Sequence, residues 1–404
     1  MVVGGGILGL AVARELALRH PDRSLTVLEK EPEVGAHQTG HNSGVVHGGI
    51  YYEPGSLKAR LCVEGARLLY DYCDERGLGA DRCGKVIVAT RGDELGRLDE
   101  LERRGRANGV PGLVRLGPEE LAEIEPHVHG IAALHSPATG IVDYRAVARA
   151  LVRDLEAGGA QVLTDCAVTG ISTAGGRLAL RQARGETRPR HAIFCAGAWA
   201  DRLAVAAGAD ADPRIVPFRG AYGMLRPARR HLVRSLVYPI PDPSLPFLGM
   251  HLTRHVDGEV LVGPTALIGG GPDAYRLGQV SRRELRRILG WPGSWRMARR
   301  FWRTGLTEVR HAVSQAAFAA AAARFVPELE PGDVLPSFAG VRAQALGRDG
   351  RLVDDFVFSH TGPALHVRNA PSPAATSSLA IARLVADRAE QAFELGRLAR
   401  RQNG

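Results

Sequence analysis

The chain opens with a short apolar run, residues 1–3, followed by a stretch whose apolar side chains between residues 10 and 17 fall on one helical face. Pro21 ends this helical pattern, and a second apolar run follows at residues 25–30. Two β-type runs separated by one amphipathic helix predict a βαβ unit, the element from which dinucleotide-binding parallel sheets are built.

An irregular segment, residues 31–55, separates this unit from the next helical pattern at residues 56–77. Loops longer than about 12–15 residues inside a compact domain are uncommon and usually functional. Farther along, residues 160–182 and 188–204 predict strands that return to the first sheet, the second ending in the sequence CAGA where a helix begins. Small side chains at such a strand end let the backbone approach a bound ligand.

Alternation of the β type dominates residues 213–268, and the Asp257-Gly258 pair within them predicts a hairpin turn. This region therefore predicts a second, antiparallel sheet. Residues 279–325 follow a helical pattern, and a final long helix begins after the Pro-, Ser- and Thr-rich turn at residues 371–377. The free N–H groups at the start of that helix would favour a negatively charged group beside them.

Composition is that of a large globular protein. With 404 residues and 45% apolar composition, the chain can bury a substantial core. Its five cysteines include no CxxC pair, which argues against a disulfide framework or a zinc site and indicates a reducing compartment. We find no basic and apolar leader and no apolar run of about 18 residues, so we expect a cytoplasmic protein without a spanning helix.

Cations exceed anions in the chain, 52 Lys+Arg against 43 Asp+Glu, which gives a net charge of +9. Such an excess favours nucleic acid, an anionic bilayer or an acidic substrate as a partner, or it is an ordinary solvated surface. Arginine clusters at residues 226–234 and 282–303 lack the aromatic-interleaved pattern of nucleic-acid binding. We expect no nucleic-acid partner, and an anionic membrane surface stays a candidate.

The first βαβ unit carries a dinucleotide fingerprint. Gly4-x-Gly6-x-x-Gly9 lies between the strand and the helix, and Glu29 follows Gly9 by 20 residues. Glycines at these positions let the backbone approach a pyrophosphate at the helix N-terminus, and the acid accepts hydrogen bonds from ribose hydroxyls. The alternative is that the glycines only permit tight packing. The fingerprint alone fits nicotinamide and flavin dinucleotides equally, and the loop at 31–55 favours flavin.

The sequence HQTGHNSGVVHGGIYYEPGSLKAR, residues 37–60, concentrates hydroxyl, amide and glycine positions in that loop. Its backbone N–H groups and polar side chains would line an extended cofactor. Three histidines, His37, His41 and His47, raise the question of a metal site. Their spacings, with no carboxylate or thiol partner in the loop, match no standard arrangement, so we predict no metal.

Taken together, the segments GGGILGL, HQTGHNSGVVHGGIYYEPGSLKA, CGKVIVAT, SPATGIVDY, PFRGAYGML, YPIPDPSLPFLGMHLTR, GVRAQA and NAPSPAATSSLAIA carry a resemblance that runs from about Gly4 to Val385. The chain resembles the L-2-hydroxyglutarate oxidase/dehydrogenase family, within the FAD-dependent, D-amino-acid-oxidase-like superfamily. The resemblance implies FAD as the cofactor, oxidation of (S)-2-hydroxyglutarate to 2-oxoglutarate, and reoxidation by oxygen or by membrane quinone. The quinone route implies a peripheral position on the inner face of the plasma membrane.

The predicted fold class is α/β (α+β mixed), with a Rossmann-type FAD-binding domain and an inserted antiparallel-sheet substrate domain. We assign residues 1–80, 140–212 and 332–404 to the FAD-binding domain, and residues 81–139 and 213–331 to the substrate domain. The expected FAD contacts are Gly4, Gly6, Ile7, Leu8, Gly9, Glu29, Lys30, Thr39, Gly40, Asn42, Ser43, Gly44, Val168, Ala196, Gly197, Pro373, Ala374, Ala375 and Thr376.

Oxidation of a 2-hydroxy acid on a flavin needs a hydride acceptor, which is flavin N5, a base for the hydroxyl proton, and cations for the carboxylates. Histidine is the natural base near neutral pH, and His251 and His47 are the two candidates. Arg342, in GVRAQ, resembles the superfamily position that binds a substrate carboxylate. Regular alternation along LGMHLTR places His251 and Arg254 on opposite faces. The other candidate substrate contacts are Arg254, Arg219, Lys58 and Tyr238.

Two alternatives of other classes stay open. One is a different oxidoreductase of the superfamily, acting on an amine or on glycerol 3-phosphate. The other is a flavin-binding redox module without turnover. Bleaching of the flavin by a particular substrate would separate these alternatives from each other.

Overall fold

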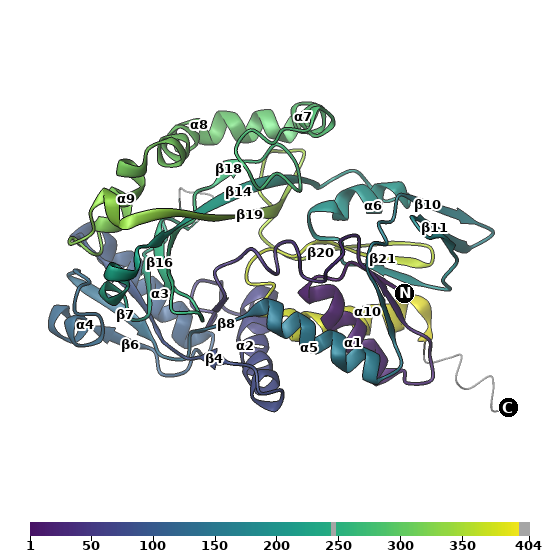
Figure 1. Cartoon of the computed structure of the whole chain (residues 1–404), viewed down its shortest axis with the longest axis horizontal. Coiled ribbons are helices and arrows are strands. Elements are labelled where there is room, and N and C mark those ends of the chain that lie inside the picture. Colours follow the sequence, from purple (N-terminus) through teal and green to yellow (C-terminus); the bar gives the residue numbers. More distant parts are fainter. Residues whose placement is uncertain (244–247, 396–404) are drawn as a thin grey trace.

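The computed structural model describes residues 1–243 and 248–395, and two sheets dominate this part of the chain (Figure 1). The first is six-stranded, with β1 at its centre because the buried pair Val2–Val3 lies parallel to both flanking strands. In spatial order its strands are β20 (Val357–Thr361), β21 (Ala364–Asn369), β13 (Ala192–Phe194), β1 (Val2–Val3), β2 (Thr26–Leu28) and β9 (Gln161–Leu163).

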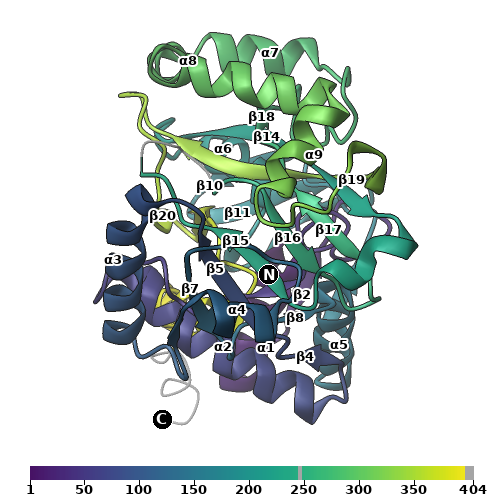
Figure 2. The ribbon, with the colours of Figure 1, turned by 90° about the vertical axis from the view of Figure 1, so that its left-hand side faces the viewer.

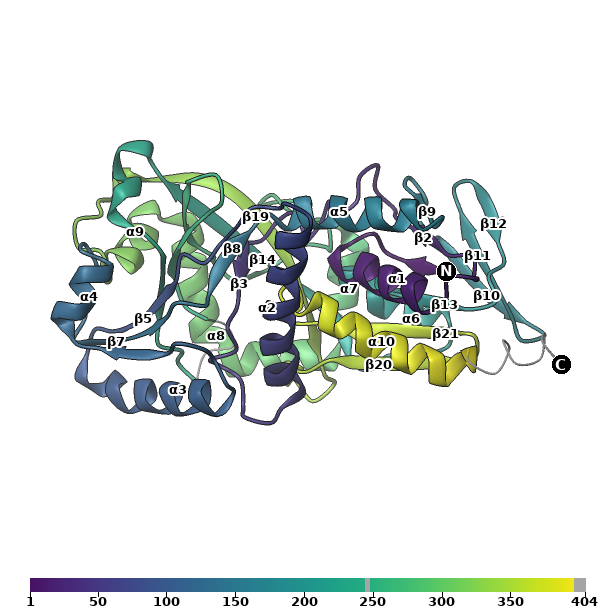
Figure 3. The ribbon, with the colours of Figure 1, turned by 90° about the horizontal axis from the view of Figure 1, so that it is seen from below.

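Four helices share one hydrophobic core with this sheet, and Figure 3 shows them side by side. They are α1 (Ile7–Arg19), α2 (Leu57–Glu75), α5 (Tyr144–Ala157) and α10 (Ser378–Phe393). Capping residues set two of their starts: the Ser56 hydroxyl accepts from Ala59 N, and the Asp143 carboxylate accepts from Arg145 N. The predicted βαβ unit and the predicted final helix are therefore confirmed.

The second, nine-stranded sheet of the described residues contains the predicted hairpin, since β16 and β17 pair antiparallel and Gly258 takes a φ of +82° in the turn. The spatial order is β18 (Leu267–Ile268), β14 (Arg214–Leu225), β17 (Val260–Gly263), β16 (His251–Arg254), β15 (Leu236–Pro239), β5 (Lys85–Ala89), β7 (Ala132–Ser136) and β6 (Val114–Leu116), with β19 (Val334–Leu346) paired to β14.

Two expectations about this sheet need correction. It is not purely antiparallel, because β5 and β15 pair in parallel; they are far apart in the chain, and no tight turn joins them. The expected boundary at residue 332 is also wrong for β19. That strand pairs with β14 from Arg214↔Leu346 to Leu225↔Val334, so residues 334–346 belong with the second sheet.

Helices cover both faces of the second sheet (Figure 2). On one side, α7 and α8 lie over β14 and β18, and α9 lies beside them. The helices outside the first core are α3 (Leu95–Ala107), α4 (Pro118–Ile124), α6 (Ala200–Ala206), α7 (Arg282–Leu289), α8 (Pro292–Val313) and α9 (Gln315–Ala323). Short 3₁₀ turns occupy Gly92–Glu94, Gly197–Trp199, Pro227–Leu232 and Pro331–Asp333.

Two small sheets complete the described fold. Residues 160–182 were expected to return to the first sheet, and only part of them does so, as strand β9. The strands β10 (Gly170–Ala174), β11 (Arg177–Gln182) and β12 (Gly185–Thr187) pair only with one another and form the first small sheet. The other sheet contains β3 (Val45–Val46), β8 (Gly140–Val142) and β4 (Ala80–Asp81). Residues 244–247 of the YPIPDPSLPFLGMHLTR segment lie outside the described residues.

None of the helices in residues 1–243 and 248–395 combines the length and the apolar character that a bilayer crossing requires.

Candidate functional site

In the glycine turn after β1, two of the three fingerprint glycines are required by packing and the third is not. A Cβ on Gly4, whose φ is +115°, would lie 2.3 Å from the Cys195 carbonyl oxygen, and a Cβ on Gly9 would lie 1.9 Å from the Gly4 carbonyl oxygen. Both glycines are therefore required by the packing of the backbone itself. A Cβ on Gly6 would meet only Thr39 Oγ1, at 3.5 Å. Packing therefore does not require a glycine at position 6, and the space beside it at the start of α1 is open.

Glu29 lies at the end of β2, beside this turn, and is buried. Its Oε2 accepts from Gly5 N at 2.6 Å, and its Oε1 accepts from Glu31 N at 2.9 Å. A carboxylate has about four lone-pair sites, so these two bonds leave capacity for a ribose hydroxyl. The neighbouring Lys30 is engaged differently, because its ammonium pairs with Glu31 and with Asp273.

The loop of residues 31–55 is anchored to the start of α1 and to the second sheet. Thr39 Oγ1 accepts from Ile7 N at 2.9 Å, and Gln38 Oε1 accepts from Ala343 N of β19. Ser43 lies close enough to Tyr238 for its hydroxyl to influence the pKa of that phenol. The loop thereby joins the glycine turn to the strands that carry the candidate substrate contacts.

Three loop residues for which FAD contacts are predicted also have clear structural roles. The amide nitrogen of Asn42 donates to the carbonyls of Gln38 and Thr39, and its amide oxygen accepts from Gly44 N at 2.7 Å. Gly44 has a φ of +72°, and a Cβ on Gly40 would lie 2.1 Å from Arg145 Nε. These residues set the shape of the loop, which is a positioning role.

The C-terminal turn lies against the same loop. Thr376 Oγ1 accepts from His47 N at 3.1 Å and lies 3.3 Å from the Val45 carbonyl oxygen, to which it donates. At the start of α10, the fully buried hydroxyls of Ser377 and Ser378 have no partner among the described residues. An open glycine turn fits the pyrophosphate of an FAD molecule, and open polar groups at a helix N-terminus fit its flavin ring.

The remaining expected FAD contacts are spread along this arrangement. Ala196 and Gly197 follow β13, where Gly197 has a φ of +52° and space for a Cβ 3.5 Å from Gln38 Nε2. Val168 packs against the core under the other face of the first sheet. Leu8 belongs to α1, and the turn before α10 holds Pro373, Ala374 and Ala375.

His251, on β16, is 5% exposed and is held in one orientation. Its Nδ1 lies 2.9 Å from the Gly249 carbonyl oxygen, so Nδ1 carries the proton and Nε2 is left as the acceptor. The imidazole stacks on the phenol ring of Tyr238, with ring centroids 4.1 Å apart. Burial, together with the smaller effect of the Arg342 and Lys85 charges, lowers the pKa of His251 to about 3, so the side chain is neutral near pH 7.

His47, from the loop, belongs to the same neighbourhood. Burial holds its pKa well below the usual value, and the nearby Lys85 and His251 add to that effect. Its Nδ1 is buried without a partner among the described residues, and so is the hydroxyl of Tyr51. The structure therefore brings together the two histidines singled out in the sequence.

The candidate cations differ in their surroundings. Arg342 lies on β19 opposite Phe218 of β14, and its charge influences both His251 and Tyr238. Arg219 donates from Nε to the Tyr275 carbonyl oxygen at 2.8 Å, and burial lowers its pKa.

Arg254 and Lys58 are already paired. The Arg254 side chain is 43% exposed, and its Nη1 lies 3.5 Å from Asp81 Oδ2, so it is engaged away from His251, and its contact with the substrate stays a prediction. Alternation along β16 explains this result, since His251 and Thr253 face the interior. Lys58 Nζ forms an ion pair with Asp354 Oδ1 at 2.7 Å.

Sequence reasoning missed Lys85. It begins β5, a strand buried along its whole length, and is itself 1% exposed. Its Nζ lies 4.2 Å from the ring centroid of Tyr238 and 5.2 Å from that of Tyr51. The available signal was the lone charge at the head of the apolar run VIVA, at a position where a buried strand normally holds an apolar side chain.

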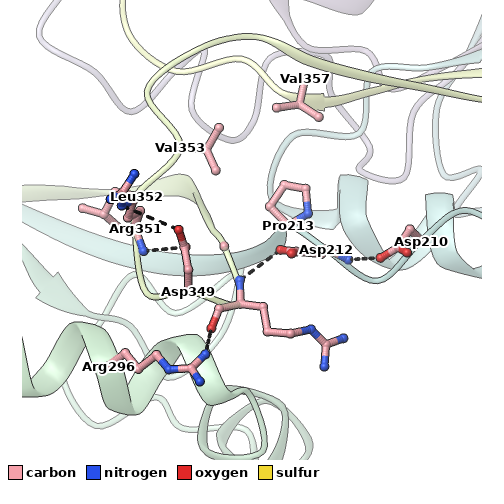
Figure 4. Close-up of a pocket in the computed structure, with 11 residues that line it drawn as sticks. Asp210, Asp212, Pro213, Arg296, Asp349, Arg351, Leu352, Val353 and Val357 are labelled. Atoms are coloured by element: carbon pink, nitrogen blue, oxygen red, sulfur yellow. Dashed lines mark hydrogen bonds and ion pairs between the residues drawn. The ribbon is translucent and has the colours of Figure 1, made fainter.

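A surface hollow lies away from this site, and the described residues form no metal-binding cluster. The hollow drawn in Figure 4 contains none of the predicted site residues, and several of its polar side chains engage one another or backbone groups, as when Asp212 Oδ1 accepts from Arg348 N at 3.0 Å. The described part of the chain holds no group of three or more His, Cys, Asp or Glu side chains arranged for a metal ion.

Comparison with known proteins gives consistent results. The family model described as FAD dependent oxidoreductase matches residues 1–388. The mitochondrial L-2-hydroxyglutarate dehydrogenase of Homo sapiens is 45% identical over 98% of this chain and 89% of that protein. The L-2-hydroxyglutarate dehydrogenase of Indibacter alkaliphilus is 41% identical over 97% and 99%.

Solved structures share the fold. The dithionite-reduced L-alpha-glycerophosphate oxidase of Mycoplasma pneumoniae, which has FAD bound, superposes with a TM-score of 0.76 and 26% identity over 95% of this chain and 92% of that one. The glycine oxidase of Geobacillus kaustophilus superposes with a TM-score of 0.71 and 21% identity over 96% and 94%, which speaks for the fold alone.

Proposed function

The chain belongs to the L-2-hydroxyglutarate dehydrogenase family of FAD-dependent oxidoreductases, and on that premise we propose that it oxidises L-2-hydroxyglutarate to 2-oxoglutarate. The observation that carries the proposal is the neutral, buried imidazole of His251, which lies near two cationic side chains, Lys85 and Arg342. A base for a hydroxyl proton and cations for two carboxylates are what this substrate requires.

The residues that would hold FAD lie at three places. Gly6 and the start of α1 are open for the pyrophosphate, Glu29 has capacity for the ribose, and the Ser377 and Ser378 hydroxyls are open at the start of α10. When bound, FAD supplies the acceptor for the two electrons that leave the substrate.

His251 is our choice for the base. Because its Nδ1 is held by the Gly249 carbonyl, its Nε2 is fixed as the atom that takes the hydroxyl proton. A pKa of about 3 would make it a weak base on its own. The substrate is a dianion, and nearby negative charge raises the pKa of a histidine, so substrate binding would bring His251 closer to the proton affinity that the reaction needs.

The deciding experiment is the visible spectrum of the purified flavoprotein before and after anaerobic addition of L-2-hydroxyglutarate. We expect the flavin to bleach with this substrate, much more slowly with L-lactate, and least with D-2-hydroxyglutarate. Rapid bleaching by glycerol 3-phosphate or by an amine instead would assign the chain to another reaction of the superfamily. A flavin that none of these compounds bleaches would favour a redox module without turnover.

For the electron acceptor, we propose a membrane quinone reached from an anionic bilayer surface, with oxygen as the alternative. The support comes from α8, on the outer side of the second sheet (Figure 1). Five apolar side chains on this helix are exposed, and the four that follow its kink at Phe301 are spaced 4, 3 and 4 residues apart, which places those four along one stripe. The five are Trp295, Trp302, Leu306, Val309 and Val313, with exposed fractions of 59%, 57%, 61%, 47% and 75%.

Arginines flank this stripe and extend onto α7, where Leu285 and Leu289 are also exposed. On α8 they are Arg296, Arg299, Arg300, Arg303 and Arg310. Tryptophan and arginine around an exposed apolar stripe are the composition of helices that lie in the headgroup region of anionic bilayers. In a cell, this surface would place the protein peripherally on the inner face of the plasma membrane.

A further inference from the structure

Lys85 is a buried cation without a counter-ion. Among residues 1–243 and 248–395, its Nζ has no hydrogen-bond or ion-pair partner, and it lies over the faces of Tyr238 and Tyr51. A buried ammonium group is unfavourable unless an anion or strong acceptors replace its lost hydration. An unpaired lysine in a buried strand therefore indicates a missing anionic ligand.

The groups around Lys85 also have unused hydrogen-bonding capacity. The hydroxyl of Tyr51 and the Nδ1 of His47 are both buried without a partner in the described part of the chain. Buried polar groups in native proteins are normally satisfied, so a cluster of exceptions at one place points to a ligand that completes it. Two of the other candidate cations lack this property, because Lys58 is paired with Asp354 and Arg254 with Asp81; Arg219 has a buried Nη1 without a partner among the described residues, but its Nε is bound to the Tyr275 carbonyl oxygen.

Strand order places Lys85 and Arg342 on opposite sides of His251. The sheet runs β19, β14, β17, β16, β15, β5, so the strand of His251 lies between the strands of the two cations. Neighbouring strands are about 4.8 Å apart, so β5 lies about 10 Å from β16. β19 lies three strands from β16, about 14 Å away, yet the charges of Arg342 and Lys85 both lower the pKa of His251, so a dicarboxylate bound beside this histidine would have one cation on each side.

We infer that Lys85 binds the distal carboxylate of the substrate, while Arg342 binds the carboxylate next to the reacting carbon. This assignment rests on the proposed function and extends it to specificity. Lys85 is then the residue that distinguishes a dicarboxylate from a monocarboxylate, and Tyr51 donates its free hydroxyl to the same carboxylate.

Protonation is consistent with this role. Burial lowers the pKa of Lys85 to about 7, so the free enzyme holds a mixture of ammonium and amine at neutral pH. A carboxylate beside it favours the ammonium form. A lysine with such a pKa is also a conceivable base, and the experiment must separate the two roles.

The test compares wild type, Lys85→Met and Lys85→Arg in anaerobic flavin bleaching by L-2-hydroxyglutarate and by (S)-2-hydroxybutanoate, which lacks the distal carboxylate. A hydrogen bond to a charged group is worth enough to change an equilibrium by about 10- to 100-fold, so Lys85→Met should lower kcat/KM for L-2-hydroxyglutarate by that factor. It should leave the value for (S)-2-hydroxybutanoate nearly unchanged. Lys85→Arg should recover part of the selectivity.

Binding gives a second readout that needs no turnover. Titration of the flavin absorbance with glutarate should show weaker binding to Lys85→Met than to wild type, with FAD content unchanged. Arg14→Met is the control, because it removes a cation on α1 that is paired with Asp154, outside this cluster, and should leave the ratio of the two substrates unaltered.

The outcomes separate cleanly. If wild type is not bleached by L-2-hydroxyglutarate, the proposed function fails. If wild type is bleached and Lys85→Met lowers the rates with both substrates equally, Lys85 acts as the base and the inference is overturned. If Lys85→Met leaves both rates and glutarate binding unchanged, the lysine has no part in the site.

Discussion

The imidazole of His251 stacks on the phenol ring of Tyr238, with ring centroids 4.1 Å apart and planes inclined by 24°. His251 lies on β16 and Tyr238 on the adjacent β15, so the pairing of two strands sets the contact. With Nδ1 held by Gly249, the ring has little freedom to turn. Preorganisation of this kind is what a general base requires, because its acceptor atom must already point at the proton it removes.

Replacement of His251 by Gln should therefore remove the base while keeping a polar side chain. Loss of a general base typically costs about 10²–10⁴ in rate, and we expect this loss in the flavin-reduction step. Stopped-flow absorbance under anaerobic conditions measures that step. FAD content should remain that of wild type, and an unchanged reduction rate would move the role to His47.

Arg342→Ala should behave differently from Lys85→Met. Because Arg342 is assigned to the carboxylate that every 2-hydroxy acid carries, its loss should lower kcat/KM for L-2-hydroxyglutarate and (S)-2-hydroxybutanoate alike, each by about 10- to 100-fold. Steady-state kinetics with both substrates checks this prediction. A selective loss with the dicarboxylate alone would mean that the two cations have been assigned the wrong way round.

The glycine turn allows a matched pair of substitutions. Gly6→Val should abolish FAD binding and leave the apoprotein folded, since a Cβ there meets only Thr39 Oγ1 at 3.5 Å. Gly9→Ala should instead destabilise the apoprotein, because its Cβ would lie 1.9 Å from the Gly4 carbonyl oxygen. Bound-flavin absorbance and thermal unfolding of the apoproteins distinguish the two effects. Full FAD occupancy in Gly6→Val would overturn the cofactor assignment.

Stability should depend on pH through Lys85 in a predictable direction. Its pKa is about 7 in the folded protein and near the ordinary value of 10.5 when unfolded, so the unfolded chain binds more protons between these values. Wild-type stability should therefore rise with pH across that window relative to Lys85→Met. We expect Lys85→Met to be the more stable protein at pH 7 and the difference to shrink toward pH 10. Denaturant unfolding of both proteins, compared at each pH, measures it; a constant difference would argue against an unpaired buried lysine.

Local signals explain what the sequence predicted correctly. The glycine turn and Pro21 act within a few residues of their own positions, so they specify the βαβ unit directly. The same holds for the turn at Gly258.

The errors arose where partners lie far apart in the chain. β5 pairs with β15, and β19 pairs along β14, and neither contact leaves a local pattern. The role of Lys85 also depends on residues that are distant in the chain. Its charge at the head of an apolar strand was visible, but its burial without a counter-ion appears only once Tyr238 and Tyr51 are brought to it.

The exposed stripe of α8 gives the last prediction. Purified protein should bind vesicles containing anionic lipid at low salt and dissociate as salt rises, because part of the attraction is between arginines and headgroups. The double variant Trp295→Ser/Trp302→Ser removes the two exposed indoles that would enter the headgroup region. It should bind much more weakly, while flavin bleaching by substrate stays that of wild type.

Charge reversal tests the flanking arginines separately. Each well-placed cation contributes roughly 1 kcal/mol at an anionic surface, so Arg299→Glu/Arg303→Glu should weaken vesicle binding by at least about tenfold. Leu18→Ser is the matched control, since Leu18 is 63% exposed on α1, away from the stripe. Sedimentation with anionic and with neutral vesicles gives the binding, and sedimentation velocity without lipid gives the oligomeric state. Equal recovery in the supernatant for wild type and all variants would make the arginines ordinary surface. If wild type is a dimer and the tryptophan variant is a monomer, the stripe would instead be a contact with a second copy of the chain.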